Sequence, residues 1–168
     1  MTGPGVSIVV DRRFRGPDDS GNAGYTSGLV ATRAGTLPGG RAATVTLRVP
    51  PPLDVPMPLM AEDGRHTLRH GDTVVAEVVP SPLDVAAVEP VTGERAAATQ
   101  DDYAGLVDHP FPHGFVCGTR RSPGDGLRLA PGPLGDGSGR TACVWVPDGS
   151  LADRSGAVAP EHVWASLD

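Results

Sequence analysis

The sequence contains no lysine, and three other residue types are almost missing. All 14 basic residues are arginine, and asparagine, glutamine and isoleucine occur once each, as Asn22, Gln100 and Ile8. Lysine, asparagine and isoleucine have codons rich in A and T, so this bias indicates a very GC-rich, bacterial genome. The genome bias explains the many arginines better than a function does, and it makes the single asparagine more informative than usual.

Other absences exclude whole classes of protein. Two cysteines, Cys117 and Cys143, are too few for a disulfide framework in 168 residues. No apolar run approaches the roughly 20 residues that span a bilayer, and no charged and then apolar leader is visible, so we expect a cytoplasmic protein. The net charge of −6 excludes the usual basic surface for nucleic acid. We therefore expect neither nucleic acid nor a membrane as a partner.

What the sequence does contain is glycine and proline, with 23 and 18 residues. Such a composition requires many loops, although 39% hydrophobic residues still allow a core. The length fits one ordinary domain or two small halves.

The first 80 residues predict an α+β fold. Residues 6–10 are short, β-branched and apolar, as in a strand, and a Gly/Pro-rich loop follows. Residues 23–34 have helical spacing with a stripe of small residues, Gly24, Ser27, Gly28 and Ala31. Glycine inside a helix costs about 1 kcal/mol each, so we expect this helix to be closely packed against a sheet. The alternating pattern and turns that follow predict antiparallel strands over 44–49, 57–61, 65–69 and 73–79.

The second half is less regular. Residues 91–107 favour a surface or connecting helix, and the prolines of 109–113 exclude a helix and indicate a domain junction. Strands are predicted over 126–130 and 140–146, and a last helix begins at Pro160. Because the sequence stops about two turns into that helix, we expect a chain truncated at its C-terminal end; the alternative is a terminal helix that simply docks on the body.

No familiar catalytic signature is present, neither G-x-S-x-G, a Walker loop, H-E-x-x-H nor G-x-G-x-x-G after a strand. The best candidate is the loop 20–25, which places Asn22 and backbone N–H groups at the start of a helix. Such an end polarises a carbonyl or holds an oxyanion. The alternative is that Asn22 only caps the helix and that the glycines only allow close packing.

Two further patterns have weaker functional interpretations. His109, His113 and Cys117 lie at spacings of four, but no partner pair follows at a distance typical of zinc sites, so we expect no metal. The alternative is that the histidines belong to a polar linker. Arg121 follows Arg120 in a loop and could contact a phosphate.

Several segments over nearly the whole chain together resemble one family. The first half has Arg13-Phe14-Arg15-Gly16-Pro17, Ser20-Gly21-Asn22-Ala23-Gly24-Tyr25 and Leu47-Arg48-Val49-Pro50-Pro51-Pro52-Leu53-Asp54. The second has His109-Pro110-Phe111-Pro112, Phe115-Val116-Cys117-Gly118, Pro123-Gly124-Asp125-Gly126-Leu127, Trp145-Val146-Pro147-Asp148 and Val163-Trp164-Ala165. This combination resembles the actinobacterial hotdog-fold, thioesterase-like proteins.

The resemblance implies a central helix wrapped by a curled antiparallel sheet, in tandem units. The first hotdog unit would span 1–88, a connecting helix and linker 89–112, and an incomplete second unit 113–168. It also implies an acyl-CoA or other acyl thioester as ligand, no cofactor, and a possible homodimer formed by pairing of hotdog sheets.

The activity of the broader superfamily is acyl-CoA thioester hydrolysis. The resemblance places Asn22, Gly24 and Tyr25 at the helix entry that holds the acyl carbonyl, and Asp168 where a carboxylate acts as general base. The expected catalytic residues are therefore Asn22 and Asp168, with Gly24, Tyr25 and Arg121 as substrate-binding residues. The alternative is a non-catalytic hotdog module that binds an acyl ligand or a partner protein; a carboxylate within hydrogen-bond reach of Asn22 favours the enzyme.

Overall fold

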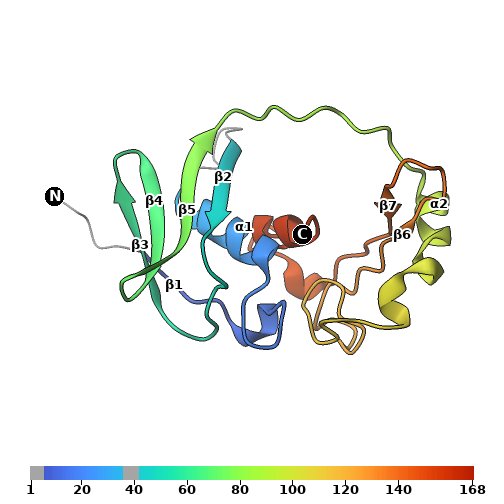
Figure 1. Ribbon diagram of the computed structural model, residues 1–168, viewed down its shortest axis with the longest axis horizontal. Coiled ribbons are helices and arrows are strands. Elements are labelled where there is room, and N and C mark those ends of the chain that lie inside the picture. The colour runs from blue at the N-terminus through green and yellow to red at the C-terminus, as the bar shows by residue number, and fades with distance from the viewer. Residues whose placement is uncertain (1–5, 36–41) are drawn as a thin grey trace.

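The computed structural model describes residues 6–35 and 42–168 of the chain. A five-stranded antiparallel sheet occupies one end of the molecule and short helices and irregular segments the other (Figure 1). The fold is therefore α+β, as the sequence predicts. Of the predicted first unit, residues 1–5 and 36–41 lie outside the described residues.

The sheet has the order β1-β3-β4-β5-β2, and each neighbouring pair is antiparallel. The consecutive strands β3, β4 and β5 form the predicted meander. Its strands are β1 Val6–Ile8, β2 Ala42–Leu47, β3 Met57–Glu62, β4 Arg65–His70 and β5 Thr73–Ser81.

The turn between β3 and β4 shows how the sequence determines the register. Asp63 and Gly64 have φ angles of 48° and 76°, the left-handed conformation that a two-residue hairpin of type I′ requires at both positions. Aspartate and glycine tolerate this conformation, so Glu62 pairs directly with Arg65. The apolar residues Leu59 and Leu68 then face each other in the core.

The helix α1, Ala23–Arg33, matches the predicted range closely. The sequence predicts that this helix packs closely against a sheet, but its closest contact is with another helix. A Cβ atom on Gly28 would lie 2.7 Å from the Cα of Glu161 and from the Cβ of Trp164, so this glycine of the small-residue stripe faces α3, Pro160–Ala165. Another side of α1 packs against β2 and β5.

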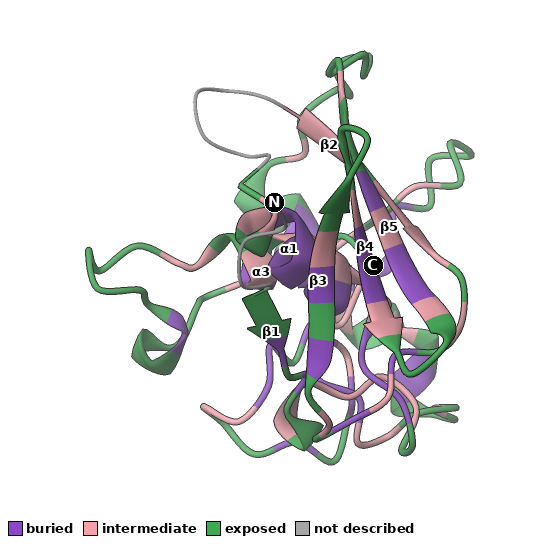
Figure 2. Ribbon diagram, turned by 90° about the vertical axis from the view of Figure 1, so that its left-hand side faces the viewer, coloured by how far each residue is buried: buried purple, intermediate pink, exposed green. Residues whose placement is uncertain are grey.

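The expectation of a sheet curled around the central helix is wrong. Figure 2 shows α1 behind the sheet, and β3, β4 and β5 each contain buried residues. The strands are short, and β1 has only three residues, so the sheet covers one side of α1 only. The α3 helix and the loop around Phe115 cover much of the rest.

The second half contains little regular structure. The predicted helix of 91–107 is reduced to α2, Gly93–Ala98, followed by 3-10 turns at Gln100–Asp102 and Ala104–Leu106. The strand predicted over 126–130 is absent as a sheet strand, although Leu127 and Leu129 donate backbone hydrogen bonds to Phe115 and Val116. The segment 140–146 forms only β7, Thr141–Ala142, which pairs with β6, Gly132–Pro133. Glycine and proline between these short pairs interrupt any longer ladder.

Both halves contribute to one hydrophobic core. Phe115 is fully buried, and it belongs to the same cluster as residues of β4, β5 and α1. The other contributors from the second half are Val116, Leu127, Leu129, Leu151 and Ala165.

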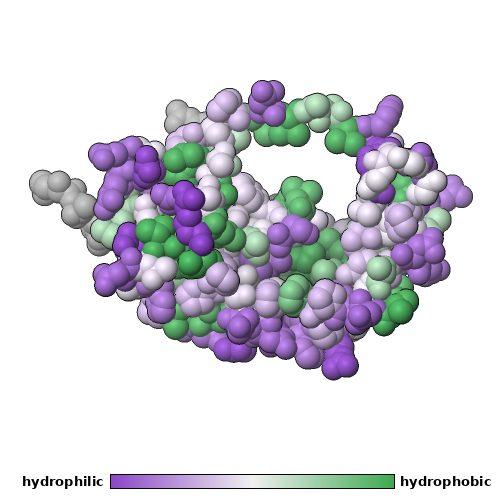
Figure 3. Space-filling view, in the orientation of Figure 1, coloured by the Kyte–Doolittle hydropathy of each residue, from purple (hydrophilic) through white to green (hydrophobic). Residues whose placement is uncertain are grey.

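The two halves are joined by an exposed connection, residues 82–92, which forms no helix or strand. It arches over the body, and the space-filling view shows an opening beneath it (Figure 3). Three large apolar side chains of the connection are exposed: Leu83, Val85 and Val88. The connection contains residue 88, where the sequence predicts that the first unit ends. This domain boundary stays a prediction.

Candidate functional site

A cleft of about 430 Å³ lies where the loop before α1, the end of β2 and the turn 111–117 meet. Its walls are mainly apolar, and the polar side chains among its lining residues are few. The apolar lining includes Leu47, Val49, Pro50, Pro51, Phe111, Phe115 and Val116; the polar side chains are Ser20, Asn22, Arg48, Cys117 and Asp168. An apolar cleft with a small number of placed polar groups is the usual form of a small-molecule site.

Asn22 is held rigidly at the start of α1. Its side-chain Oδ1 accepts a hydrogen bond from the backbone N–H of Tyr25 at 2.8 Å, and its own N–H donates to the carbonyl of Phe14 at 2.8 Å. Only 7% of its surface is exposed. Asn22 is therefore the N-cap of α1.

The cap leaves the amide nitrogen of Asn22 for a second partner. Its Nδ2 donates a hydrogen bond to Oδ2 of Asp168 at 2.7 Å. These two candidate catalytic residues are separated by 146 positions in the sequence, and the contact between α1 and α3 brings them together.

Gly24 makes this arrangement possible. A Cβ atom at this position would lie 2.6 Å from the carbonyl oxygen of Trp164 and 2.7 Å from the Cβ of Asp168. Without a side chain, α3 can approach α1 closely enough for Asp168 to reach Asn22. Gly24 thus positions Asp168, and it lines the groove beside α3 and not the cleft.

The side chain of Asn22 can donate a hydrogen bond to a ligand, and that of Asp168 can accept a proton. One N–H of the Asn22 amide is bonded to Asp168, and the other has no partner among the described residues. Together with the positive end of the α1 dipole it can donate to a carbonyl oxygen in the cleft. Asp168 is exposed and, when ionised, keeps lone pairs that can accept a proton from water.

Tyr25 does not line this cleft. Its ring stacks on Phe14 with centroids 3.9 Å apart and nearly parallel planes. Burial raises the pKa of its hydroxyl well above the ordinary value, and the nearby carboxylates of Glu161 and Asp11 add to this. The side chain lines a separate small cavity of about 140 Å³ beside β1. Its backbone N–H, and not its ring, takes part in the helix entry.

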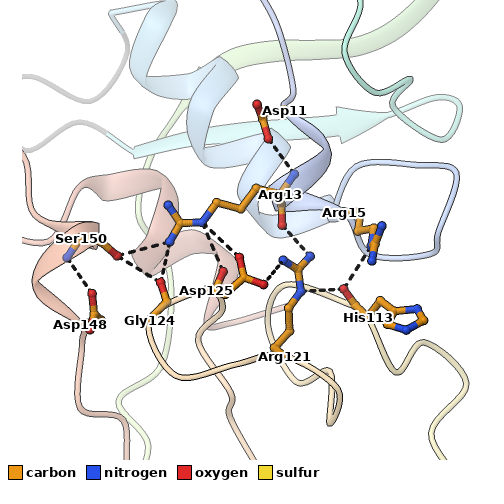
Figure 4. A network of polar contacts seen from close by, with 9 residues as sticks. All are labelled: Asp11, Arg13, Arg15, His113, Arg121, Gly124, Asp125, Asp148 and Ser150. Carbon is orange, nitrogen blue, oxygen red and sulfur yellow. Dashed lines mark hydrogen bonds and ion pairs between the residues drawn. The ribbon is translucent and has the colours of Figure 1, made fainter.

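Arg121 is also directed away from the cleft. Its Nε, Nη1 and Nη2 donate to the carbonyl of His113, to Oδ2 of Asp125 and to the carbonyl of Arg13, at 2.8, 3.0 and 2.7 Å. Figure 4 shows this side chain and that of Arg13 on either side of Asp125. With only 7% of the side chain exposed, its three nitrogens tie the loop 113–125 to the loop before α1. A phosphate would have to compete with these bonds.

The residues that the sequence analysis leaves out of the site are the apolar wall and Cys117. The prolines after β2 and the phenylalanines of 111–115 could have been found from their apolar type in a loop. Cys117 is considered there only as a metal ligand. In the part of the chain that the structure describes, no three histidine, cysteine or acidic residues are grouped closely enough to hold a metal ion.

No protein-family model matches the chain, and neither does any curated protein or solved structure. Among the described residues, no helix combines the length and apolar character needed to cross a membrane. The function must therefore be inferred from the cleft and its side chains.

Proposed function

We propose that the protein binds an acyl thioester, such as an acyl-CoA, in the cleft and hydrolyses it by attack of water. The observation that carries this proposal is the 2.7 Å hydrogen bond between Asn22 and Asp168 beside an apolar cleft. A carboxylate within reach of Asn22 is the feature that favours an enzyme over a binding module.

Each part of the site has a role in this reaction. The acyl chain lies against the apolar wall, and its carbonyl oxygen accepts a hydrogen bond from the free N–H of Asn22. Asp168 takes a proton from a water molecule whose oxygen attacks the carbonyl carbon. The N–H and the α1 dipole stabilise the negative oxygen of the tetrahedral intermediate. The C–S bond then breaks, and the thiolate leaves and takes up a proton.

The same proposal includes a hotdog-related fold. It is supported by α1 lying against one face of an antiparallel sheet with its N-terminus at the cleft. The tandem units with the boundaries given above and a homodimer formed through the sheets belong to the proposal too. In the structure, β1 and β2 are the two edge strands of this sheet, and β2 is the longer strand available for such pairing.

The experiment is a hydrolysis assay with acyl-CoAs of increasing chain length, in which a thiol reagent detects the released CoA. Replacing the proposed base, Asp168→Asn, is expected to lower kcat at least about 100-fold, a typical effect of losing a general base. Asp84→Asn is the matched control, because Asp84 is exposed on the connection and does not line the cleft. No release with any chain length would contradict the proposal.

A second substitution separates capping from catalysis. Asn22→Asp keeps a good helix cap but removes the N–H donor and puts a carboxylate beside Asp168. We expect the protein to stay folded and its kcat to fall at least about tenfold, since a developing oxyanion would lose a donor and meet a negative charge. Unchanged kcat in Asn22→Asp would remove the role proposed for the amide.

The alternative is a module that binds an acyl ligand or a partner protein without turnover. A second, apolar groove of about 550 Å³ beside α3 favours it, because exposed Leu83, Val163 and Leu167 line it. This alternative predicts that a non-hydrolysable acyl-CoA analogue binds to the wild type, while neither the wild type nor Asp168→Asn releases CoA from the thioester.

A further inference from the structure

A pocket of about 560 Å³ lies beside α2, in the part of the molecule away from the sheet (Figure 1). Its walls come from α2 and the 3-10 turn after it, from the loop 123–128 and from the segment 144–148. None of its described lining residues also lines the cleft that contains Asn22 and Asp168. The pocket is therefore a separate candidate site, and an inference about it does not rest on the proposed hydrolysis.

Arg128 brings a positive charge to this pocket. The residue is exposed, and its guanidinium has no ion pair or hydrogen bond among the described residues. Its φ of 54° is unusual for a residue with a side chain and costs free energy. The N–H groups of Leu127 and Leu129, on either side, both donate hydrogen bonds of 2.8 Å to the turn 115–116 and hold this conformation. The fold thus keeps an unpaired guanidinium at the pocket in a backbone conformation that glycine adopts with less strain.

Two neutral side chains of the pocket also have N–H groups to donate. The side-chain Oε1 of Gln100 accepts a hydrogen bond from the backbone N–H of Val144 at 2.8 Å, so its amide nitrogen is left for another partner. Nε1 of Trp145 is buried and has no hydrogen-bond partner among the described residues. Buried indole N–H groups are usually paired. An acceptor in this pocket would therefore satisfy a donor that the protein itself leaves unpaired.

Asp148 limits the charge that a ligand can carry. It is the only acidic residue among the described residues that line the pocket. It accepts a hydrogen bond from the backbone N–H of Ser150 at 2.9 Å, which holds the pKa of its carboxyl below the ordinary value. Its negative charge balances that of Arg128 and would repel a second negative charge on a ligand. A carboxylate, which has one charge and matches the fork of an arginine, therefore fits better than a phosphate dianion.

We propose that this pocket binds a small carboxylate that carries an aromatic ring. Arg128 donates two N–H groups to the carboxylate, and the Gln100 amide and the Trp145 indole donate to its remaining lone pairs. The ring of the ligand lies against the flat apolar surfaces of Trp145, Pro123 and Pro147. The strain at Arg128 is then explained, because it holds the cation where the ligand needs it.

A titration with sodium benzoate tests the site, with the two indole N–H signals followed by nitrogen–proton correlation NMR. The sequence has two tryptophans, and Trp164 lies in α3 and does not line this pocket. We expect the Trp145 signal to move and to reach saturation, while the Trp164 signal stays in place; Trp164→Phe assigns the two signals. Equal movement of both signals at constant ionic strength, or movement of neither, would overturn the proposal.

Related probes identify the chemistry that the pocket recognises. Benzamide has the same ring without a charge, and it should bind at least about tenfold more weakly because it cannot form charge-assisted hydrogen bonds. Phenyl phosphate carries more than one negative charge at neutral pH and should also bind at least about tenfold more weakly, since it meets Asp148. Equal affinity for benzamide and benzoate, or tighter binding of phenyl phosphate, would contradict the assignment of a carboxylate.

Substitution of Arg128 separates binding from folding. Arg128→Gln should raise the Kd for benzoate at least about tenfold. Arg154→Gln is the matched control and should leave it unchanged, because Arg154 is also exposed, has no partner in the described part of the chain and does not line the pocket. Arg128→Gly should lose benzoate too, yet unfold at a urea concentration at least as high as the wild type, because glycine relieves the strain of the positive φ. An unchanged Kd in Arg128→Gln, or the same loss in Arg154→Gln, would overturn the site.

Discussion

The imidazole ring of His162 lies in an aromatic cluster between α3 and the rest of the core. Its centroid is 5.8 Å from that of Phe14, 5.7 Å from Tyr25 and 5.8 Å from Phe115. The residue is only 7% exposed, and its Nδ1 has no hydrogen-bond partner in the described part of the chain. Burial lowers the pKa of this histidine; Glu161 opposes the shift and Arg13 adds to it. The fold therefore favours the neutral form of His162.

This burial predicts a loss of stability in mild acid. Because the pKa of His162 is lower in the folded protein than its value of about 6.5 in an unfolded chain, the unfolded chain binds more protons between these values. The contribution of His162 to the free energy of unfolding is complete above about pH 6.5 and decreases as the pH falls toward the folded pKa. Urea unfolding between pH 7.5 and about 5 measures this slope.

Two variants identify the source of that slope. His162→Phe keeps an aromatic ring in the cluster but cannot be protonated, so its stability should depend less on pH in this window. His70→Gln is the control, because His70 is exposed at the end of β4 and should not affect the slope. A slope that is the same in His162→Phe as in the wild type would contradict the prediction.

For single residues, the sequence indicates which side chains have suitable chemistry, but it does not indicate what surrounds each of them in the fold. Asn22 can be identified because a lone asparagine precedes a helical pattern, and the cap and the Asp168 contact both use its amide. Arg121 and Tyr25 have plausible binding chemistry, but the bonds that occupy Arg121 come from residues up to 108 positions away, and Tyr25 is enclosed by the core. Long-range contacts of this kind cannot be read from local sequence.

At the scale of elements, the contact between α1 and α3 has the clearest consequence. A Cβ atom on Gly28 would meet the backbone of Glu161 and the side chain of Trp164 at 2.7 Å. Gly28→Ala is therefore expected to destabilise the protein by about 1–3 kcal/mol through overpacking, although alanine is the better helix former by about 1 kcal/mol. Urea unfolding gives the difference in free energy. The same displacement of α3 moves Asp168, so kcat in the hydrolysis assay should fall as well.

Gly93→Ala is the matched control for this substitution. Gly93 also lies in a helix, at the start of α2, but a Cβ atom there would have no neighbour within 4 Å. The change should leave stability unchanged or raise it by up to about 1 kcal/mol. If Gly28→Ala and Gly93→Ala had the same effect, the close approach of α3 to α1 would be wrong.

Regular elements are predictable where periodicity and turn residues agree. The strands β3 to β5 are separated by turns with glycine, burial alternates at the start of β3, and the predicted ranges of the three strands differ from the observed ones by one or two residues. In the second half, the segment around Leu127 and Leu129 has a strand-like pattern, yet it pairs only with Phe115 and Val116. Arg128 within this segment has a φ of 54°, which interrupts the extended backbone. Nothing in the neighbouring sequence predicts that angle.

For the whole molecule, the decisive feature is that one core receives side chains from both halves while an exposed connection joins them. Elastase, which cleaves after small aliphatic residues, should cut first near Ala86 and Ala87 in the connection, since exposed segments without secondary structure are the preferred sites of nicking. We expect the two fragments to remain together in native size-exclusion chromatography, because Phe115 and Leu127 of the second fragment stay buried among residues of the first. Separate fragments, with the first still cooperatively folded, would instead indicate two independent units and contradict the shared core. The shared core also predicts that residues 1–88 expressed alone unfold at a lower urea concentration than the nicked protein, because they lack the core side chains of the second half.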